Sequence, residues 1–323
     1  MTSNLNPRID ILLATYNGER FIQEQLDSLL AQSYENWKII IRDDGSSDNT
    51  LGIVGEFIKK HGDRIELIDD GDKGLGPSGN FARLLENSTA QYIMFCDQDD
   101  VWKEDKIKLT FEKMKEIENN GYKDKPILVH TDLEVVNKEL ETVADSMFQY
   151  QNLNSNFVNL NNLLTQNNVT GCTTMINQSL KEKALPISKN AMMHDWWLAL
   201  VASAFGKIGF VSNSTIKYRQ HGGNDTGAKR YSFSYFYQRV KGYNKLFEMV
   251  NKNFKQAESF YLTYKSELTA EMLGDIEHYI ELKNINKFKR VQVINKYGFL
   301  KQGMIRNIGF FIIVFMMNKE KII

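Results

Sequence analysis

Short apolar runs alternate with amphipathic stretches along the first third of the chain. The apolar runs are too short for buried helices and are rich in isoleucine, leucine and aromatic residues, so each predicts a strand. They are residues 9–14, 37–42, 64–68 and 92–96. The stretches between them place apolar side chains at helical spacing, over residues 19–31, 50–60 and 81–86. Strands that alternate with helices predict an α/β fold with a mostly parallel central sheet flanked by helices.

The pattern is less regular in the middle third of the chain. A helix is expected to end before Gly121, and an extended stretch follows at Ile127–Val136. Small and β-branched residues within Asn167–Asn177 suit a strand that lines a pocket. A helix is predicted to begin near His194, and Phe210–Gln220 returns to a strand-like pattern.

Charge divides the chain into two regions. The sequence holds 40 Lys and Arg against 40 Asp and Glu, but residues 226–323 hold 17 against 8, which makes this region net +9 and residues 1–225 net −9. From Tyr231 onward the sequence is also helical and aromatic. We therefore predict one domain over residues 1–225 and a helical, basic region over 226–323. The acidic first region argues against nucleic acid as a partner, whereas the basic region predicts an anionic partner such as a membrane surface.

An apolar run lies near the end of the chain, at Ile308–Met317. Its ten residues are too few to span a bilayer as a helix. Flanked by Arg306, Lys319 and Lys321, the run fits the interface of a membrane, and it equally fits a buried terminal helix or a homodimer contact.

Targeting and redox signals are sparse. Residues 1–8 lack the basic-then-apolar layout of a signal peptide, and no stretch reaches the roughly 20 apolar residues that span a bilayer. We therefore expect a cytoplasmic protein, with peripheral contact at the inner face of the cell membrane through the C-terminus. Cys96 and Cys172 lie in apolar surroundings without zinc or disulfide spacing, so both are predicted to be core residues.

The strand predicted at residues 92–96 ends in three carboxylates, those of Asp97, Asp99 and Asp100. Carboxylates this close repel one another unless a hard cation such as Mg²⁺ or Mn²⁺ holds them, and such ions leave positions open for phosphate oxygens. The motif therefore predicts a metal–diphosphate site. The alternative is a solvated loop in which Asp100 caps the next helix.

Polar residues also follow two other predicted strands, at Thr15–Gly18 and Asp43–Ser46. In parallel sheets, ligands bind outside the carboxyl ends of the strands, so these segments and the acidic motif point to one crevice. The glycine-rich segment Lys73–Asn80 precedes a helix and could offer backbone N–H groups to a phosphate. It is a poor dinucleotide fingerprint, because it does not follow the first strand and Pro77 lacks an N–H.

These motifs together resemble the family 2 inverting glycosyltransferases of the GT-A fold, over about residues 8–225. Five segments carry the resemblance, in the family's order and rough spacing. They are Ala14–Gly18, Asp43–Thr50, Gly79–Asn80, Asp97–Asp100 and His194–Trp197. Within the family, Cys96–Trp102, His194–Trp197 and Tyr218–His221 are most similar to bacterial rhamnosyltransferases that build surface polysaccharides.

The resemblance implies roles for individual residues. Those implied to bind the nucleotide sugar are Thr15, Asn17, Asp43, Asp44, Asn80 and Asp97. Thr15 and Asp44 would hold the nucleobase, since an aspartate suits the imide N–H of uracil or thymine, and Asp97 would approach the ribose. Asp99 and His221 would bind Mg²⁺ or Mn²⁺, which neutralises the diphosphate leaving group, although a histidine in a glycine-rich loop is as often a surface residue.

The second half of the resemblance concerns the start of the helix near His194. Asp195 matches the family's catalytic base, which deprotonates the acceptor hydroxyl, and Trp196 would form a stacking wall for the acceptor sugar. Trp197 is expected to be core. The family usually has Glu-Asp where this chain has His194-Asp195, so a role assigned to the preceding acid does not carry over.

The predicted function is that of a metal-dependent glycosyltransferase of the hexosyltransferase type. On the resemblance, it transfers L-rhamnose from dTDP-rhamnose to a glycan or polyprenyl-linked acceptor in the synthesis of cell-wall or other surface polysaccharide. A UDP-hexose-dependent enzyme of the same fold is the alternative. A non-catalytic nucleotide-sugar-binding scaffold is disfavoured because the base and metal carboxylates are both present. A dehydrogenase is disfavoured because the first loop lacks the glycine fingerprint.

Overall fold

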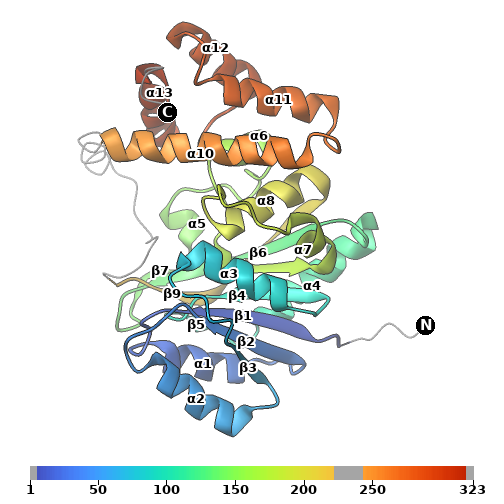
Figure 1. The fold of residues 1–323 in the computed structure, drawn as a ribbon, viewed down its shortest axis with the longest axis vertical. Helices are drawn as coiled ribbons and strands as arrows, with labels where there is room; N and C mark the ends of the chain where they lie inside the picture. Colours follow the sequence, from blue (N-terminus) through green and yellow to red (C-terminus); the bar gives the residue numbers. More distant parts are fainter. Residues whose placement is uncertain (1–5, 222–242, 318–323) are drawn as a thin grey trace. The chain divides into compact units, whose positions relative to one another are not determined.

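The structure is a computed structural model that describes residues 6–221 and 243–317 (Figure 1). The chain divides into two compact units. The first comprises Met1–Met147, Val169–Ile187 and Met193–Ala228, and the second comprises Phe148–Asn168, Ser188–Met192 and Lys229–Ile323. Two short internal segments therefore group with the C-terminal helices. The boundary predicted at residue 225 lies outside the described residues and stays a prediction.

The first unit contains a nine-stranded sheet with the order β3-β2-β1-β4-β8-β6-β9-β5, in which β7 pairs with β6. The strands are β1 (Ile9–Thr15), β2 (Trp37–Asp43), β3 (Ile65–Ile68), β4 (Tyr92–Cys96), β5 (Val101–Trp102), β6 (Ile127–Val136), β7 (Thr142–Ala144), β8 (Thr174–Asn177) and β9 (Lys207–Arg219). Strands β1 to β4 are parallel, whereas β8 runs antiparallel to β4 and β6. Strand β6 therefore runs in the same direction as β4, and β9 pairs parallel with β6. The predicted mostly parallel sheet is confirmed, with β5, β7 and β8 antiparallel to their neighbours.

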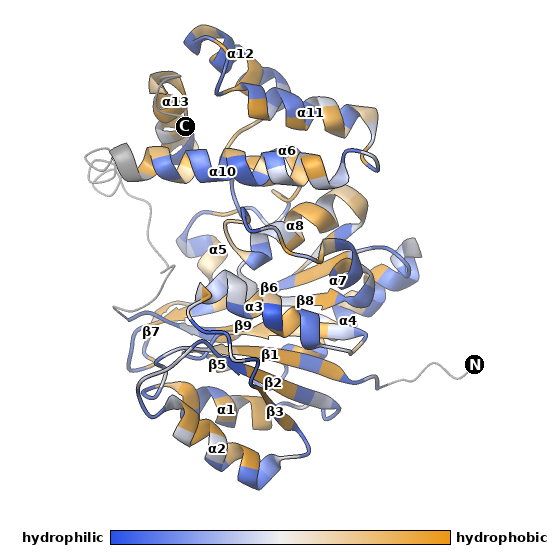
Figure 2. Cartoon of the chain, viewed as in Figure 1, coloured by the Kyte–Doolittle hydropathy of each residue, from blue (hydrophilic) through white to orange (hydrophobic). Residues whose placement is uncertain are grey.

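Helices cover both faces of this sheet. Those of the first unit include α1 (Ile22–Leu30), α2 (Thr50–His61), α3 (Gly76–Asn87), α4 (Lys106–Ile117), α7 (Gln178–Ala184) and α8 (His194–Phe205), with a π-helical turn η1 (Glu118–Tyr122) after α4. Figure 1 shows α1 and α2 on one side of β1 to β3, and α3 and α8 on the other. Strands β4 and β6 are buried along their whole length, as expected for strands covered on both faces. Figure 2 shows hydrophobic residues concentrated on the central strands.

Two predicted elements have different bounds in the structure. Helix α3 begins at Gly76, five residues before the predicted start, with Pro77 in its first turn, where a missing N–H costs nothing. The strand predicted within Asn167–Asn177 is limited to β8, and a 3₁₀ turn, η2 (Gly171–Thr173), precedes it. The hydroxyls of Thr173 and Thr174 donate to the carbonyls of Thr170 (2.6 Å) and Gly171 (2.7 Å), and these local bonds favour a turn over strand pairing.

The second unit is helical. It contains α6 (Leu160–Thr165), α10 (Tyr243–Tyr264), α11 (Ala270–Glu281), α12 (Lys287–Tyr297) and α13 (Met304–Met316), and α5 (Met147–Tyr150) lies where the two units meet in sequence. Its core includes Phe254, Phe260, Tyr279 and Phe299, each fully buried. Among the helices that the structure describes, none is both long and apolar enough to cross a membrane.

Candidate active site

The carboxyl ends of β1 and β2 are adjacent and joined by side chains. Thr15 and Asp43 are paired in register, and the Thr15 hydroxyl donates to Asp43 Oδ2 over 2.8 Å. Asp43 Oδ1 accepts the N–H groups of Gly45 (3.0 Å) and Ser46 (2.7 Å). Asn17, at a positive φ of 49°, donates its N–H to the Ser46 hydroxyl over 2.8 Å. The structure therefore brings Thr15, Asn17 and Asp43 into one pair of interlocked turns.

Asp44 lies beneath these turns, with 6% of its surface exposed. Its two carboxylate oxygens accept the N–H groups of Leu75 (2.9 Å) and Gly76 (2.8 Å) at the start of α3, together with Arg42 Nη1 (3.3 Å). The helix N-terminus favours this negative charge. Because these N–H groups of the glycine-rich segment bind Asp44, they are not directed at a phosphate.

Arg42 connects Asp44 to the predicted sugar-binding residue Asn80. The guanidinium group of Arg42 is 1% exposed, donates to Asn80 Oδ1 over 3.0 Å, and forms a two-pronged ion pair with Asp70 at 2.9 and 2.8 Å. The amide of Asn80 donates to the backbone carbonyls of Arg42 (3.2 Å) and Thr15 (3.4 Å). Asn80 is thus tied to the ends of β1 and β2.

The loop after β4 brings together the two predicted metal ligands. Asp99 Oδ2 lies 2.6 Å from His221 Nε2, and both side chains are partly exposed, at 16% and 19%. The His221 ring packs on Phe21, with the ring centroids 4.7 Å apart. The side chains that meet here come from residues 122 positions apart in sequence.

Arg219, at the end of β9, holds this loop in place and is 3% exposed. Its Nε donates to the Asp99 carbonyl over 2.9 Å, and its backbone N–H donates to Asp100 Oδ1 over 3.1 Å. The guanidinium group also pairs with Glu24 and lies 4.8 Å from the centre of the Phe21 ring. The buried Arg219 thus fixes the backbone of the acidic loop, while the side chain of Asp99 stays partly exposed.

Asp100 does not cap a helix, which corrects that alternative. It is fully buried, β5 follows it directly, and α4 begins only at Lys106. Burial raises the pKa of the Asp100 carboxyl well above its usual range, and the charges of Asp99 and Asp97 raise it further. Lys106 is equally buried, with Nζ 4.5 Å from the centre of the Trp102 ring, and burial lowers its pKa to about 8.

The acidic loop fits a hard divalent cation. Asp99 and His221 are partly exposed, and carboxylate oxygens are the ligands that Mg²⁺ and Mn²⁺ prefer. Oxygen and sulfur atoms of Asp97, Asp100 and Cys172 also lie within 4.8 Å of one another. Cys172 is buried and burial raises the pKa of its thiol, so this inner set is a poor match for a hard cation. The outer pair therefore fits the predicted metal better.

The first turn of α8 buries the predicted base. Asp195 is 8% exposed and Trp196 is half-buried, whereas Trp197 is fully buried and donates Nε1–H to the Ala184 carbonyl (3.1 Å), which confirms it as core. The His194 ring packs against Phe81, with centroids 4.2 Å apart. Burial lowers the pKa of His194 to about 3, so the ring is neutral near pH 7 and acts as an aromatic packing group.

The turn η2 joins the acidic loop to the predicted base. Cys172 Sγ belongs to the cluster with Asp97 and Asp100. At the preceding residue, Gly171, an added Cβ would lie 3.0 Å from His194 Nε2 and 3.4 Å from Asp195 Oδ2. Two consecutive residues thus lie next to Asp195 and next to the acidic loop, so the predicted base and the predicted metal-binding loop lie near one turn.

The sequence analysis assigned no role to Arg42, Lys106 or Gly171, and it included Arg219 only as part of Tyr218–His221. Arg42 and Lys106 each lie directly beside a pair of acidic residues, which was their one signal in the sequence. Both cysteines are buried, as predicted.

Comparison with known proteins places this geometry in a family. Residues 10–182 match the model for glycosyl transferase family 2. The chain belongs to this family. The dTDP-rhamnosyl transferase RfbG of Shigella flexneri is 32% identical over 239 residues, which cover 71% of this chain and 78% of RfbG. The resemblance inferred from the motifs is therefore confirmed.

Solved structures confirm the GT-A fold of the family 2 chain. S. aureus TarS 1-349 in complex with UDP-GlcNAc has a TM-score of 0.56 and 15% identity, over 90% of this chain and 80% of TarS 1-349. The mannosyltransferase PcManGT from Pyrobaculum calidifontis, in complex with GDP-Man and Mn²⁺, has a TM-score of 0.56 and 14% identity, over 90% and 74%. At this identity the likeness concerns the fold.

Proposed function

We propose that this family 2 glycosyltransferase moves a sugar from a nucleoside diphosphate to an acceptor hydroxyl with inversion at the anomeric carbon. The observation that carries the proposal is the turn η2, in which Gly171 lies so near Asp195 that an added Cβ would be 3.4 Å from its Oδ2, and Cys172 lies in the cluster with Asp97 and Asp100. A metal-facing loop and a base at one site are the two groups that such a displacement needs.

The residues divide the chemistry between them. Asp195 accepts the proton of the acceptor hydroxyl. At the same time the oxygen of that hydroxyl forms a bond to the anomeric carbon, and the bond between the anomeric carbon and the diphosphate breaks. A divalent cation, when bound, offsets the negative charge that develops on the leaving diphosphate. Asp99 and His221 would hold this Mg²⁺ or Mn²⁺, and Asp97 would approach the ribose of the donor. Thr15, Asn17, Asp43, Asp44 and Asn80 would shape the nucleotide side of the crevice, and Trp196 would stack on the acceptor.

The proposed donor is dTDP-rhamnose, supported by the likeness to RfbG over most of both chains. A UDP-hexose is the second candidate, supported by the fold shared with TarS, which was solved with UDP-GlcNAc. The acceptor would be a glycan or polyprenyl-linked sugar of a surface polysaccharide. The enzyme would work in the cytoplasm, at the inner face of the cell membrane.

A donor screen tests the proposal. Purified protein is incubated with dTDP-rhamnose, UDP-glucose or UDP-GlcNAc, each with Mn²⁺, Mg²⁺ or EDTA, and release of free nucleotide is measured. We expect release from dTDP-rhamnose with either cation, suppressed by EDTA and by Asp195→Asn. Release from the UDP-sugars and not from dTDP-rhamnose would indicate that the donor is a UDP-hexose. Binding of a donor without turnover of any of the three sugars would favour a non-catalytic nucleotide-sugar-binding scaffold.

A further inference from the structure

Helix α13 has two apolar faces. One side faces the core of the second unit, where Phe310, Ile313 and Val314 are at most 5% exposed. The other side carries large apolar residues that are 36% to 69% exposed, namely Met304, Ile308, Ile312, Phe315 and Met316. Their spacing of three or four residues places them on one side of the helix. The apolar run is therefore buried on one side only. Packing in the core explains the apolar residues of that side and leaves those of the exposed side unexplained.

A neighbouring helix extends the exposed side. Phe288 of α12 is 68% exposed and meets Phe315 edge to face, with ring centroids 5.9 Å apart. Lys287 Nζ lies 5.1 Å from the centre of the Phe315 ring and 5.5 Å from that of Phe288. We call Phe288, Met304, Ile308, Ile312, Phe315 and Met316 the α12–α13 surface. Figure 2 shows the hydrophobic character of α13.

The charges within the segment that carries this surface have one sign. Residues 287–317 contain six Lys and Arg and no Asp or Glu. Arg290 is buried and donates to the carbonyls of Val314 and Met317, each over 2.7 Å, so it serves the C-terminal end of α13. Lys287, Lys289 and Lys296 are exposed. Lys287 lies against the apolar surface itself, and the other two lysines belong to the same helix, α12. Exposed cations together with an apolar face are the composition of helices that lie in a membrane interface.

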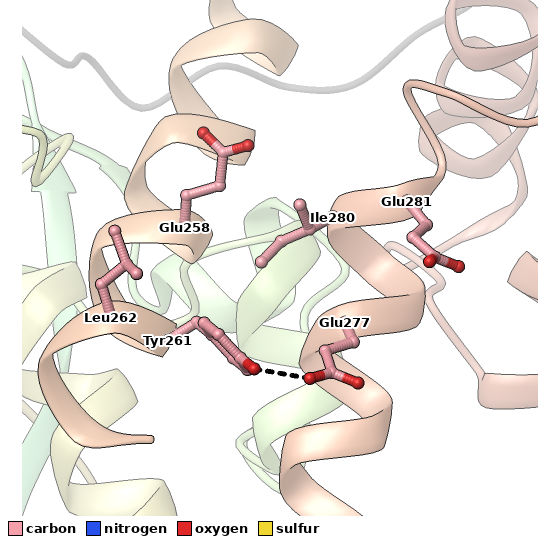
Figure 3. Close-up of a pocket in the computed structure, with 6 residues that line it drawn as sticks. All are labelled: Glu258, Tyr261, Leu262, Glu277, Ile280 and Glu281. Carbon is pink, nitrogen blue, oxygen red and sulfur yellow. Dashed lines mark hydrogen bonds between the residues drawn. The ribbon is translucent and has the colours of Figure 1, made fainter. Parts of the chain in front are cut away.

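The opposite charge collects elsewhere in the same unit. A groove of about 390 Å³ between α10 and α11 is lined by Glu258, Glu277 and Glu281 (Figure 3). Tyr261 donates to Glu277 there over 2.5 Å, and Leu262 at its edge is 65% exposed. Glu258 is also paired with Lys283, so Glu277 and Glu281 leave the groove acidic. An anionic surface would avoid this groove and favour α12 and α13.

We propose that the α12–α13 surface docks on an anionic lipid bilayer, with its apolar side chains at the boundary between headgroups and acyl chains and its lysines against the headgroups. This deepens the peripheral membrane location proposed above by naming the residues that make the contact. Vesicle binding needs no sugar donor, so its failure and the failure of sugar transfer are separate results.

Co-sedimentation of the full-length protein with lipid vesicles tests the proposal. Wild type should bind vesicles of phosphatidylcholine mixed with phosphatidylglycerol and should not bind phosphatidylcholine alone. Phe315→Asp should weaken binding more than tenfold, since it puts a charge into the apolar boundary. Lys287→Glu should weaken it by more than the roughly fivefold expected for loss of one lysine. Binding should fall with added salt.

The matched control is Leu262→Asp, which changes a still more exposed apolar residue of the same unit, on the acidic groove (65% exposed, against 38% for Phe315). It should bind vesicles as wild type does. Point variants are preferable to removal of residues from Gly303 onward, because truncation would also delete the buried Phe310 and Val314. Circular dichroism of each variant checks that the helices are retained.

Equal binding by wild type and Phe315→Asp, or equal binding to neutral and anionic vesicles, would overturn the proposal. So would light scattering that shows a wild-type dimer and a Phe315→Asp monomer without any difference in vesicle binding. In that case the occupant of the surface would be a second copy of the chain.

Discussion

The turn after β2 and the loop after β4 both place aspartates at the carboxyl end of a parallel strand, yet the two regions use them differently. In the turn, Asp43 and Asp44 accept several hydrogen bonds from backbone N–H groups and Arg42. In the loop, Arg219 binds the backbone carbonyl of Asp99, and the carboxylate of Asp99 faces His221 at partial exposure. The carboxylates of the turn are occupied by hydrogen bonds that fix its backbone, whereas the carboxylate of Asp99 is the one proposed to bind a metal.

The largest expected difference within the loop is between Asp99 and its neighbour Asp100. Asp99→Asn should weaken metal-dependent donor binding by more than the roughly 100-fold that loss of an outer-shell partner costs. Asp100→Asn should change it far less, because Asp100 is buried and asparagine keeps an acceptor for the Arg219 N–H. Mn²⁺ titrations of donor binding measure both. Equal titrations for wild type and Asp99→Asn would remove Asp99 as a ligand.

Substitutions in the hydrogen-bonded turn after β2 should lower the free energy of unfolding. Arg42→Ala leaves Asp44 buried without its cation, so we expect a loss of about 3 kcal/mol in the free energy of unfolding. The control is Arg83→Ala, whose ion pairs with Asp72 and Glu86 are exposed and should contribute at most about 1 kcal/mol. Urea unfolding measures both variants. Similar midpoints for the two would contradict a shaping role for the buried network.

A smaller effect is expected where the loop and the base meet. Gly171→Ala would place a methyl group against His194 and Asp195, and we expect turnover to fall roughly tenfold while donor affinity holds, since small misplacements of a reacting group are costly. Gly274→Ala on α11 meets no atom within 4 Å and should leave turnover unchanged. Turnover and donor Kd are measured on both variants. A loss of donor affinity in Gly171→Ala equal to its loss of turnover would indicate a disturbed fold and not a displaced base.

The smallest effect concerns acid stability. The pKa of His194 falls from 6.5 to about 3 on burial, so between these values the unfolded chain binds a proton that the folded chain does not. Stability should therefore fall as pH decreases through this window, by on the order of 1 kcal/mol per pH unit from this residue. His194→Phe should flatten the change in urea midpoint between pH 7 and pH 5. An unchanged slope would show that His194 does not contribute.

The strands of the first part of the sheet can be predicted from the sequence, whereas the pairing of the later strands and the burial of two arginines cannot. Strands β1, β2 and β4 are local apolar runs, so their ends, and with them Thr15, Asp43 and Asp97, can be predicted directly. The rest of the sheet cannot, because β8 pairs antiparallel with β6 and β9 pairs parallel with β6 across long separations, and their apolar runs do not specify strand direction. Arg42 and Arg219 lie at strand ends, where a charged residue usually indicates solvent. Their burial depends on partners that are distant in sequence, such as Asp70 and Asp99.

The resemblance supplied what local patterns could not. Asp195 is one aspartate among many by pattern alone, and its proximity to the acidic loop depends on η2, which the sequence suggested as strand. The roles that the resemblance implies for the other site residues remain predictions. These residues are Thr15, Asn17, Asp44, Asn80, Trp196 and His221.

Asp195→Asn tests the central claim most directly. If Asp195 is the base, kcat for sugar transfer should fall by roughly 10² to 10⁴, while donor Kd and its dependence on Mn²⁺ stay near wild type. The control is Glu271→Gln, which removes a charge from the first turn of α11 and should lower stability by at most about 1 kcal/mol without affecting turnover. A near-normal kcat in Asp195→Asn, with only a reduced melting temperature, would contradict the account and leave Asp195 as a helix-stabilising residue.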